Sequence, residues 1–133
     1  MKCTIRYGLC ALAAVVLLPQ AVMAQSVSGQ WAGTVTEKDV GQYTVLVEID
    51  SGQNTGAVHF LRYPCGGSLS LNRNSGAVFT FQERLTYGNE KCLDGLQARI
   101  TFQGADTAYF EEIVQGQSNV TGTLKRVRDV PRR

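Results

Sequence analysis

The amino-acid sequence predicts an all-β fold, a single antiparallel up-and-down β-barrel of about eight strands. Three observations lead to this prediction. Apolar and polar residues alternate along several short segments, clusters of turn residues separate these segments at intervals of roughly 8–12 residues, and no stretch shows convincing helical periodicity. The regular hairpin spacing favours an order in which each strand pairs with its neighbours in the sequence.

The expected strands are bounded by turn signals rich in Gly, Asn, Ser and Asp. The clearest alternation places Tyr43, Val45, Val47 and Ile49 on one face. The predicted strands cover residues 29–36, 43–50, 57–63, 68–72, 77–87, 96–103, 107–114 and 120–127.

The inward-facing positions of these strands carry many large side chains. A barrel of about eight strands is either filled by side chains or holds one small ligand. The number of bulky groups favours a filled interior and therefore recognition through the surface. The expected interior residues are Trp31, Val45, Val47, Ile49, Phe79, Phe81, Ile100, Phe102 and Phe110.

The first 24 residues have the pattern of a secretory signal peptide. Lys2 and Arg6 form a positive start, residues 9–18 are apolar, and the segment ends in small residues at Ala24. The apolar run is too short for a membrane span. We therefore expect cleavage after Ala24 and a bacterial protein that is periplasmic or secreted, with no transmembrane segment.

The remaining segment, residues 25–133, is expected to form one domain with a disordered tail at about 128–133. The chain has 13 Lys and Arg against 11 Asp and Glu, and loss of Lys2 and Arg6 leaves 11 of each (13 − 2 = 11). This balance, with basic residues clustered only in the tail, argues against a nucleic-acid partner.

Two cysteines, Cys65 and Cys92, remain after removal of the signal peptide. An even pair in an oxidising compartment predicts a disulfide bond. The chain has a single histidine, His59, and no C-x-x-C motif, so we expect no metal site and no cofactor. His59 is expected to face solvent or lie at the barrel rim.

Glu83 is a carboxylate at a position where burial is expected, because regular alternation places it on the same face as Phe81 and Leu85. A buried carboxylate must find a partner or keep its proton. The main expectation is an ion pair with Arg126 beneath Trp31. The alternatives are a ligand-facing acid at a cavity mouth and a general acid or base.

The sequence shows no second acid or nucleophile placed with Glu83, and no familiar catalytic motif. We therefore expect no enzymatic activity. A second acid close to Glu83 in an open cleft would revive the enzyme hypothesis, whereas burial of Glu83 against Arg126 would end it. Glu111 and Glu112 fall on opposite faces of one strand and are interpreted as a charged sheet edge.

The segment Gly29-Gln30-Trp31 in the first strand, together with Arg126 in the last, resembles the pattern of the calycins, the lipocalin and avidin type of barrel. This resemblance implies that Trp31 packs against Arg126 and closes one end of the barrel. The chain is shorter than a lipocalin, and avidin's biotin-binding residues have no counterparts in it.

A second resemblance is carried by Tyr63-Pro64-Cys65-Gly66-Gly67-Ser68-Leu69, Glu83-Arg84-Leu85-Thr86-Tyr87-Gly88 and Cys92-Leu93-Asp94-Gly95, together with Trp31-Ala32-Gly33. In this order the segments are similar to a small exported bacterial domain that also occurs appended to some serine/threonine kinases. The resemblance implies a β fold and a Cys65–Cys92 bridge, and it transfers no activity.

These patterns predict an exported, monomeric binding protein that recognises a protein or glycan of the cell envelope through loops on a disulfide-stapled barrel. The alternatives are an inhibitor of a cell-wall hydrolase, similar to lysozyme inhibitors, and a small-ligand carrier of calycin type. The candidate binding residues are Arg62, Tyr63, Glu83 and Tyr87.

Overall fold

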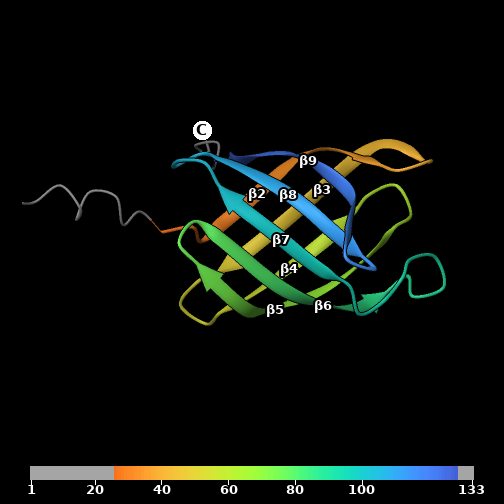
Figure 1. Cartoon of the computed structure of the whole chain (residues 1–133), viewed down its shortest axis with the longest axis horizontal. Helices are drawn as coiled ribbons and strands as arrows, with labels where there is room; N and C mark the ends of the chain where they lie inside the picture. Colours follow the sequence, from red (N-terminus) through yellow and green to blue (C-terminus); the bar gives the residue numbers. More distant parts are fainter. Residues whose placement is uncertain (1–25, 129–133) are drawn as a thin grey trace, which may run out of the picture.

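The computed structural model describes residues 26–128, which form eight antiparallel strands closed into one barrel (Figure 1). Each strand pairs with its sequence neighbours, and β2 pairs with β9 to close the cylinder. The all-β, up-and-down prediction is confirmed. The strands are β2 (Gly29–Glu37), β3 (Gly41–Asp50), β4 (Thr55–Phe60), β5 (Cys65–Ser75), β6 (Val78–Tyr87), β7 (Gln97–Phe102), β8 (Thr107–Val114) and β9 (Gln117–Val127).

The predicted signal peptide with its cleavage site lies outside the described residues, as does the predicted tail beyond Arg128. Within residues 26–128, no helix has the length and apolar character needed to cross a membrane.

Alternation along the strands places one row of side chains inside the barrel, as a half-buried strand requires. In β3, Val45, Val47 and Ile49 are buried, whereas Thr44 and Asp50 are exposed. The interior is filled mainly by branched aliphatic and aromatic side chains, with Trp31, Phe81 and Phe110 among the largest fully buried ones. Most of the residues expected inside are therefore in the core.

The barrel has two ends that differ in composition. The segments 38–40, 61–64, 88–96 and 115–116 connect strands at one end, which we call the disulfide end and which lies on the right of Figure 1. The segments 51–54, 76–77 and 103–106 lie at the other end, on the left, together with the first and last described residues; we call it the terminal end.

The disulfide joins Cys65, the first residue of β5, to Cys92 in the segment after β6, with a Cα–Cα distance of 6.5 Å. The predicted bridge is thus confirmed. It ties the 88–96 segment, the longest connection at its end of the barrel, to the barrel wall.

Several strand boundaries differ from the sequence prediction, by three residues or more at β4, β5 and β9, which begins at Gln117 instead of residue 120. β4 ends at Phe60, before the Pro64 that lacks a backbone donor, and β5 already begins at Cys65. Gly66 and Gly67 belong to β5 and not to a turn, because the neighbouring strand comes too close for a side chain. A Cβ atom at Gly67 would lie 1.9 Å from the carbonyl oxygen of Arg84.

Candidate functional site

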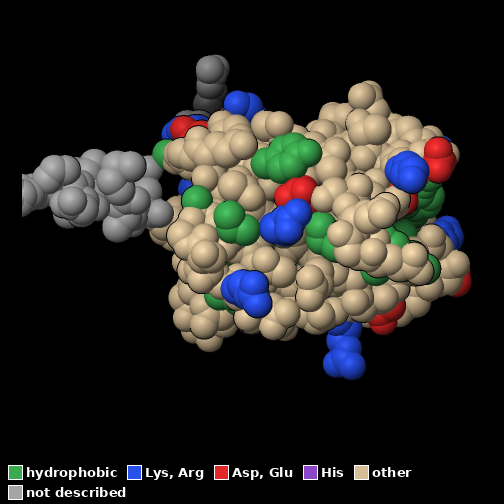
Figure 2. All heavy atoms as spheres, viewed as in Figure 1, with side chains coloured by type: hydrophobic (Ala, Val, Ile, Leu, Met, Phe, Trp, Pro, Cys, Tyr) green, Lys and Arg blue, Asp and Glu red, His purple; other side chains and the backbone are tan. Residues whose placement is uncertain are grey.

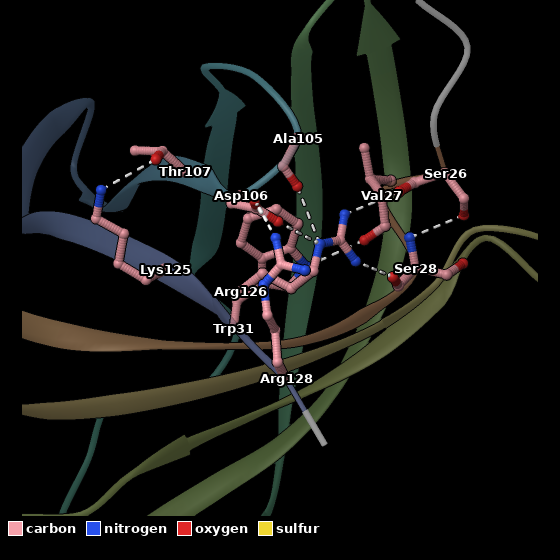
Figure 3. Close-up of polar contacts among 10 residues, drawn as sticks. All are labelled: Ser26, Val27, Ser28, Trp31, Ala105, Asp106, Thr107, Lys125, Arg126 and Arg128. Atoms are coloured by element: carbon pink, nitrogen blue, oxygen red, sulfur yellow. Dashed lines mark hydrogen bonds and ion pairs between the residues drawn. The ribbon is translucent and has the colours of Figure 1, made fainter. Parts of the chain in front are cut away.

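The terminal end of the barrel is closed by Trp31 and Arg126 (Figure 3). The Arg126 guanidinium carbon lies 4.4 Å from the centre of the Trp31 ring. The same guanidinium donates hydrogen bonds to the carbonyl oxygens of Ser26, Ser28 and Ala105. This is the contact that the calycin resemblance implies, and it ties the beginning of the described chain to the last strand.

The expected ion pair between Glu83 and Arg126 is wrong. Arg126 lies 3.5 Å from a carboxylate oxygen of Asp106, in the segment between β7 and β8. Glu83 lies one position beyond Gln82, the last residue of β6 paired with β7, on the side of the disulfide end. The expectation was based on the alternation of both strands, which points Glu83 and Arg126 towards the interior. The two side chains nevertheless lie at opposite ends of the cylinder.

Glu83 instead meets a second carboxyl group, that of Glu112, with which it is hydrogen-bonded. The exposed fractions are 1% for Glu83 and 8% for Glu112. Apart from a proton shared within the pair, no donor among residues 26–128 reaches the buried Oε2 atom of either glutamate. Two adjacent buried carboxyl groups therefore form the polar centre of the disulfide end.

Local structure explains why both carboxyl groups point inward. Glu83 follows the alternation of β6, in which Phe81 and Leu85 are also buried. Glu112 shares the inner row of β8 with Phe110, and the β8–β9 register shifts directly after it. This irregularity leaves Asn119 of β9 as an extra residue beside Glu112, and bulges of this kind re-aim side chains.

Burial raises the pKa of both carboxyl groups above the ordinary value for glutamic acid, because a charge is poorly solvated inside the barrel. For Glu112, the nearby charge of Glu83 raises the pKa further. Two like charges in contact cannot both form at low cost, so the pair retains a proton at neutral pH.

Two tyrosines and a third glutamate extend this polar centre towards the barrel opening. The Tyr63 hydroxyl donates a 3.2 Å hydrogen bond to Glu37, and Tyr43 is also hydrogen-bonded to Glu37. The Tyr43 and Tyr63 rings meet edge to face with centres 5.7 Å apart. Burial, followed by the charges of Glu37 and Glu112, raises the pKa of Tyr43, so its hydroxyl stays protonated.

These groups surround a cavity of about 170 Å³ that opens at the disulfide end. Its wall combines acidic, aromatic and aliphatic side chains with the disulfide loop. The lining residues are Glu37, Tyr43, Phe60, Tyr63, Glu83, Lys91, Cys92, Leu93, Leu96, Glu112, Val114 and Asn119.

Four exposed large apolar residues lie at the same end of the barrel, and one of them, Leu93, lines the cavity. Leu93 is 63% exposed and Leu61 is 56% exposed; Val40 and Tyr87 are exposed to a smaller degree. All four lie in or next to the segments of the disulfide end. Figure 2 shows hydrophobic side chains beside charged ones at the right-hand end of this face, and further hydrophobic side chains over its middle. We call these four residues the apolar rim.

The structure separates the four candidate binding residues. Glu83 and Tyr63 line the cavity. Arg62 lies over the outside of the Tyr63 ring, 5.8 Å from its centre. Tyr87 lies against the outer wall, where its hydroxyl is 2.7 Å from Nδ1 of His59 and its ring stacks on the imidazole.

The sequence analysis missed Glu112 and Tyr43 as site residues, although parity placed Tyr43 on the inner face. The interpretation of Glu111 and Glu112 as a charged sheet edge is wrong, because the barrel is closed. Glu111 faces outward and forms a two-point ion pair with Arg99, which lowers the pKa of Glu111. Glu112 faces inward; its position two residues after Phe110 was the signal that could have found it.

Two other cavities are more polar and less enclosed by apolar side chains. One of about 270 Å³ lies on the outer wall around Arg73 and Arg99, and one of about 370 Å³ lies beside Arg126 at the terminal end. In the part of the chain from 26 to 128, no group of three or more His, Cys, Asp or Glu side chains is arranged to hold a metal ion.

Together these features define a disulfide-containing, closed eight-stranded β-barrel with an acidic cavity at one end. No protein-family model, no curated protein and no solved structure matches this chain. Its function must therefore be argued from the site itself.

Proposed function

We propose that the chain is an exported, non-enzymatic binding protein that recognises a partner protein of the cell envelope through the disulfide end of its barrel. The observation that carries this proposal is the distribution of exposed apolar residues. Of the five large hydrophobic side chains exposed in residues 26–128, the four of the apolar rim lie at the disulfide end, and Val127 alone lies at the terminal end.

Exposed apolar side chains that gather around a concave site are typical of interaction surfaces, whereas single scattered ones need no explanation. Part of the rim is also held in place: the disulfide ties Leu93 to β5, and Asp94 accepts hydrogen bonds from the backbone of Leu85 and Gly95. A fixed loop loses little conformational entropy on binding, which favours affinity.

The size of the cavity favours a protein partner over a carried small ligand. Pockets for drug-sized ligands measure roughly 300–1,000 Å³. The cavity of about 170 Å³ is smaller and suits the end of one inserted side chain. This supports recognition by the surface, with the cavity as one part of a larger interface.

The test is capture of partners from a cell-envelope extract by the oxidised protein, scored with matched variants. Leu61→Ser and Leu93→Ser are expected to abolish capture of a specific partner, because they remove the two most exposed rim side chains. Val127→Ser, an equally simple change at the opposite end, is expected to leave capture intact. Equal capture by all three variants, or by none, would overturn the proposal.

One form of this function is inhibition of a cell-wall hydrolase. Support for it is fold analogy with small disulfide-bearing barrel inhibitors, which is weaker than support from the site. The lytic rate of lysozyme on bacterial cell walls, measured with the barrel protein at micromolar concentration, tests it directly. An unchanged rate discards this form and leaves the general proposal in place.

The carboxyl pair favours a second candidate, acid–base catalysis. A second acid does lie beside Glu83, which revives the enzyme hypothesis in part, but Glu83 is buried and not in an open cleft. Glycosidases separate their two carboxyl groups by about 5–9.5 Å across the scissile bond, whereas these two are hydrogen-bonded to each other. Aspartic proteases do share a proton between two carboxyl groups.

Release of soluble dye from labelled casein and from labelled peptidoglycan, measured at acidic and neutral pH, tests this candidate. We expect release no faster than in buffer. Turnover that disappears in Glu83→Gln would instead establish an enzyme.

A further inference from the structure

We propose that the cavity at the disulfide end receives one arginine or lysine side chain of the partner protein, whose cationic group contacts the carboxyl groups of Glu83 and Glu112 from the cavity. The proposal rests on the proposed function, because it assumes a protein partner at this end. It adds the chemistry of the contact that places this partner on the barrel.

The first argument is the hydrogen-bonding state of the carboxyl pair. Buried polar groups almost always have partners, yet apart from the proton shared within the pair no donor among residues 26–128 reaches the Oε2 atoms of Glu83 and Glu112. Both side chains line the cavity. Guanidinium and ammonium groups supply several donors and a positive charge, and they form the strongest hydrogen bonds with carboxylates.

The second argument is the charge of the surroundings. Glu37 adds a third carboxyl group to the wall, and the charge of Asp94 acts on Glu83 from the disulfide loop. Lys91 is the single basic residue among those lining the cavity, and it is exposed. An acidic interior of this kind attracts cations and disfavours anions.

The third argument is the shape and surface of the entrance. Tyr43 and Tyr63 offer aromatic rings on the way to the carboxyl pair, and rings of this type attract guanidinium and ammonium groups. Leu93 and Leu96 flank the opening and can cover the aliphatic stem of a long basic side chain. The volume of about 170 Å³ limits the guest to a single side chain end.

Binding of a cation would exchange one positive group for another. In the free protein, the proton held by the carboxyl pair reduces its negative charge. A bound guanidinium or ammonium group stabilises the ionised form and lowers the pKa of both carboxyl groups, so a proton leaves to solvent. The affinity for the cationic side chain should therefore rise with pH, from the ordinary pKa of glutamic acid through neutrality. The other titratable groups that face the pair are Glu37, Tyr43, Tyr63, Lys91 and Asp94.

The experiment is an NMR titration of the oxidised protein with four capped pentapeptides that differ only in the central residue: arginine, lysine, citrulline or norleucine. A single buried contact of this kind has a dissociation constant on the order of 1 mM. We expect the arginine and lysine peptides to shift the signals of Tyr43, Leu93 and Asn119. The neutral peptides should bind at least about tenfold more weakly, a loss of about 1.4 kcal/mol.

Glu111 and Glu112 provide a matched pair of controls, because they are adjacent and face opposite sides of the wall. Glu112→Gln is expected to abolish discrimination between arginine and citrulline, and Glu111→Gln to preserve it. Lys91→Met removes a competing positive charge and is expected to tighten arginine binding. If Glu112→Gln fails to fold, the binding of the arginine peptide to the unmodified protein is measured at several pH values instead. An affinity that does not change with pH would contradict the release of a proton from the carboxyl pair on binding.

Other outcomes separate this inference from the proposed function. Loss of partner capture in Leu93→Ser with undiminished capture in Glu112→Gln would leave the proposed function standing and overturn the cationic contact. Binding of free butylguanidinium as tightly as the arginine peptide would show a small-amine site and overturn the commitment to a partner protein. Equal binding of all four peptides would show that the carboxyl pair is a structural hydrogen bond.

Discussion

At the scale of single residues, the segments that carry the resemblance to exported bacterial domains have structural explanations around the disulfide. Gly88 has a φ of +69°, and a Cβ atom there would lie 2.7 Å from the Cβ of Cys65. Gly66 lies under the Tyr87 ring, where a Cβ would be 2.6 Å from the hydroxyl oxygen. Asp94 accepts backbone hydrogen bonds from Leu85 and Gly95. The glycines and Asp94 shape the loop, whereas other members of the pattern line the cavity: Tyr63, Glu83, Cys92 and Leu93.

Trp31 is the residue whose replacement should cost the most stability. It is buried, donates a 3.0 Å hydrogen bond from Nε1 to the carbonyl of Val27, and packs edge to face on Phe102. Trp31→Ala is expected to lower the free energy of unfolding by about 3–5 kcal/mol. Trp31→Phe keeps an aromatic ring beneath Arg126 and should cost less. Urea denaturation measures both, and a near-neutral alanine variant would contradict the packed end.

At the scale of elements, β8 and its bulge distinguish the two faces of the wall. Glu111 is held outside by Arg99, and Glu112 is inside with Asn119 beside it. Alternation along β8 gives the two neighbouring carboxyl groups opposite surroundings, one stabilised as an anion and one kept protonated by burial. A bulge next to a site is a recurrent way to aim a side chain.

The disulfide is the element that fixes the 88–96 segment. With cysteines separated by 27 positions, the chain-entropy model gives a stabilisation of about 3–4 kcal/mol. The double variant Cys65→Ala/Cys92→Ala is expected to melt at a lower temperature than the oxidised protein under the same conditions. Reduced unmodified protein is the control and should resemble the variant. Equal melting temperatures of the oxidised and reduced protein would contradict this role.

At the scale of the whole molecule, the barrel is asymmetric. The terminal end is sealed by Trp31 and Arg126, with each of the three guanidinium nitrogens donating a hydrogen bond to a backbone carbonyl. The disulfide end holds the acidic cavity and the apolar rim. The buried carboxyl groups of the disulfide end cost folding energy, because a charge is poorly solvated inside the barrel.

This cost predicts the pH dependence of stability. In the unfolded chain the two glutamates lose their protons near the ordinary pKa of 4.5, whereas burial keeps a proton on the folded pair. The folded state then binds more protons, so stability contributed by the pair is present below pH 4.5 and is lost as pH rises through the raised pKa values. The slope is about 1.4 kcal/mol per pH unit for each retained proton.

Urea denaturation across this range tests the sign. Glu112→Gln should flatten the decline, because one of the two titrating groups is removed. Glu111→Gln should leave the decline above pH 4.5 unchanged. The pKa of Glu111 is lowered in the folded protein, so this residue changes the stability only at more acidic pH, where stability falls as pH falls. A stability that rises with pH above 4.5 would contradict the buried pair.

The sequence by itself determined the fold class, because alternation with a period of two and turn residues at regular spacing leave few other arrangements. It also predicted the disulfide, since Cys65 and Cys92 are the pair that lies outside the expected signal peptide, and the inward orientation of Glu83. Strand boundaries moved by a few residues, most where Gly66 and Gly67 were taken for a turn although they are strand residues in close contact with β6.

Only the tertiary structure decided what Glu83 meets. Parity tells on which face of a strand a side chain lies, but the height of that side chain along the barrel axis depends on the register of every strand pair and on bulges. Arg126 and Glu112 both face inward; registration places Arg126 beside Trp31 and Glu112 beside Glu83. The acidic cavity and its apolar rim exist because distant segments meet at one end of a closed cylinder, which no local pattern encodes.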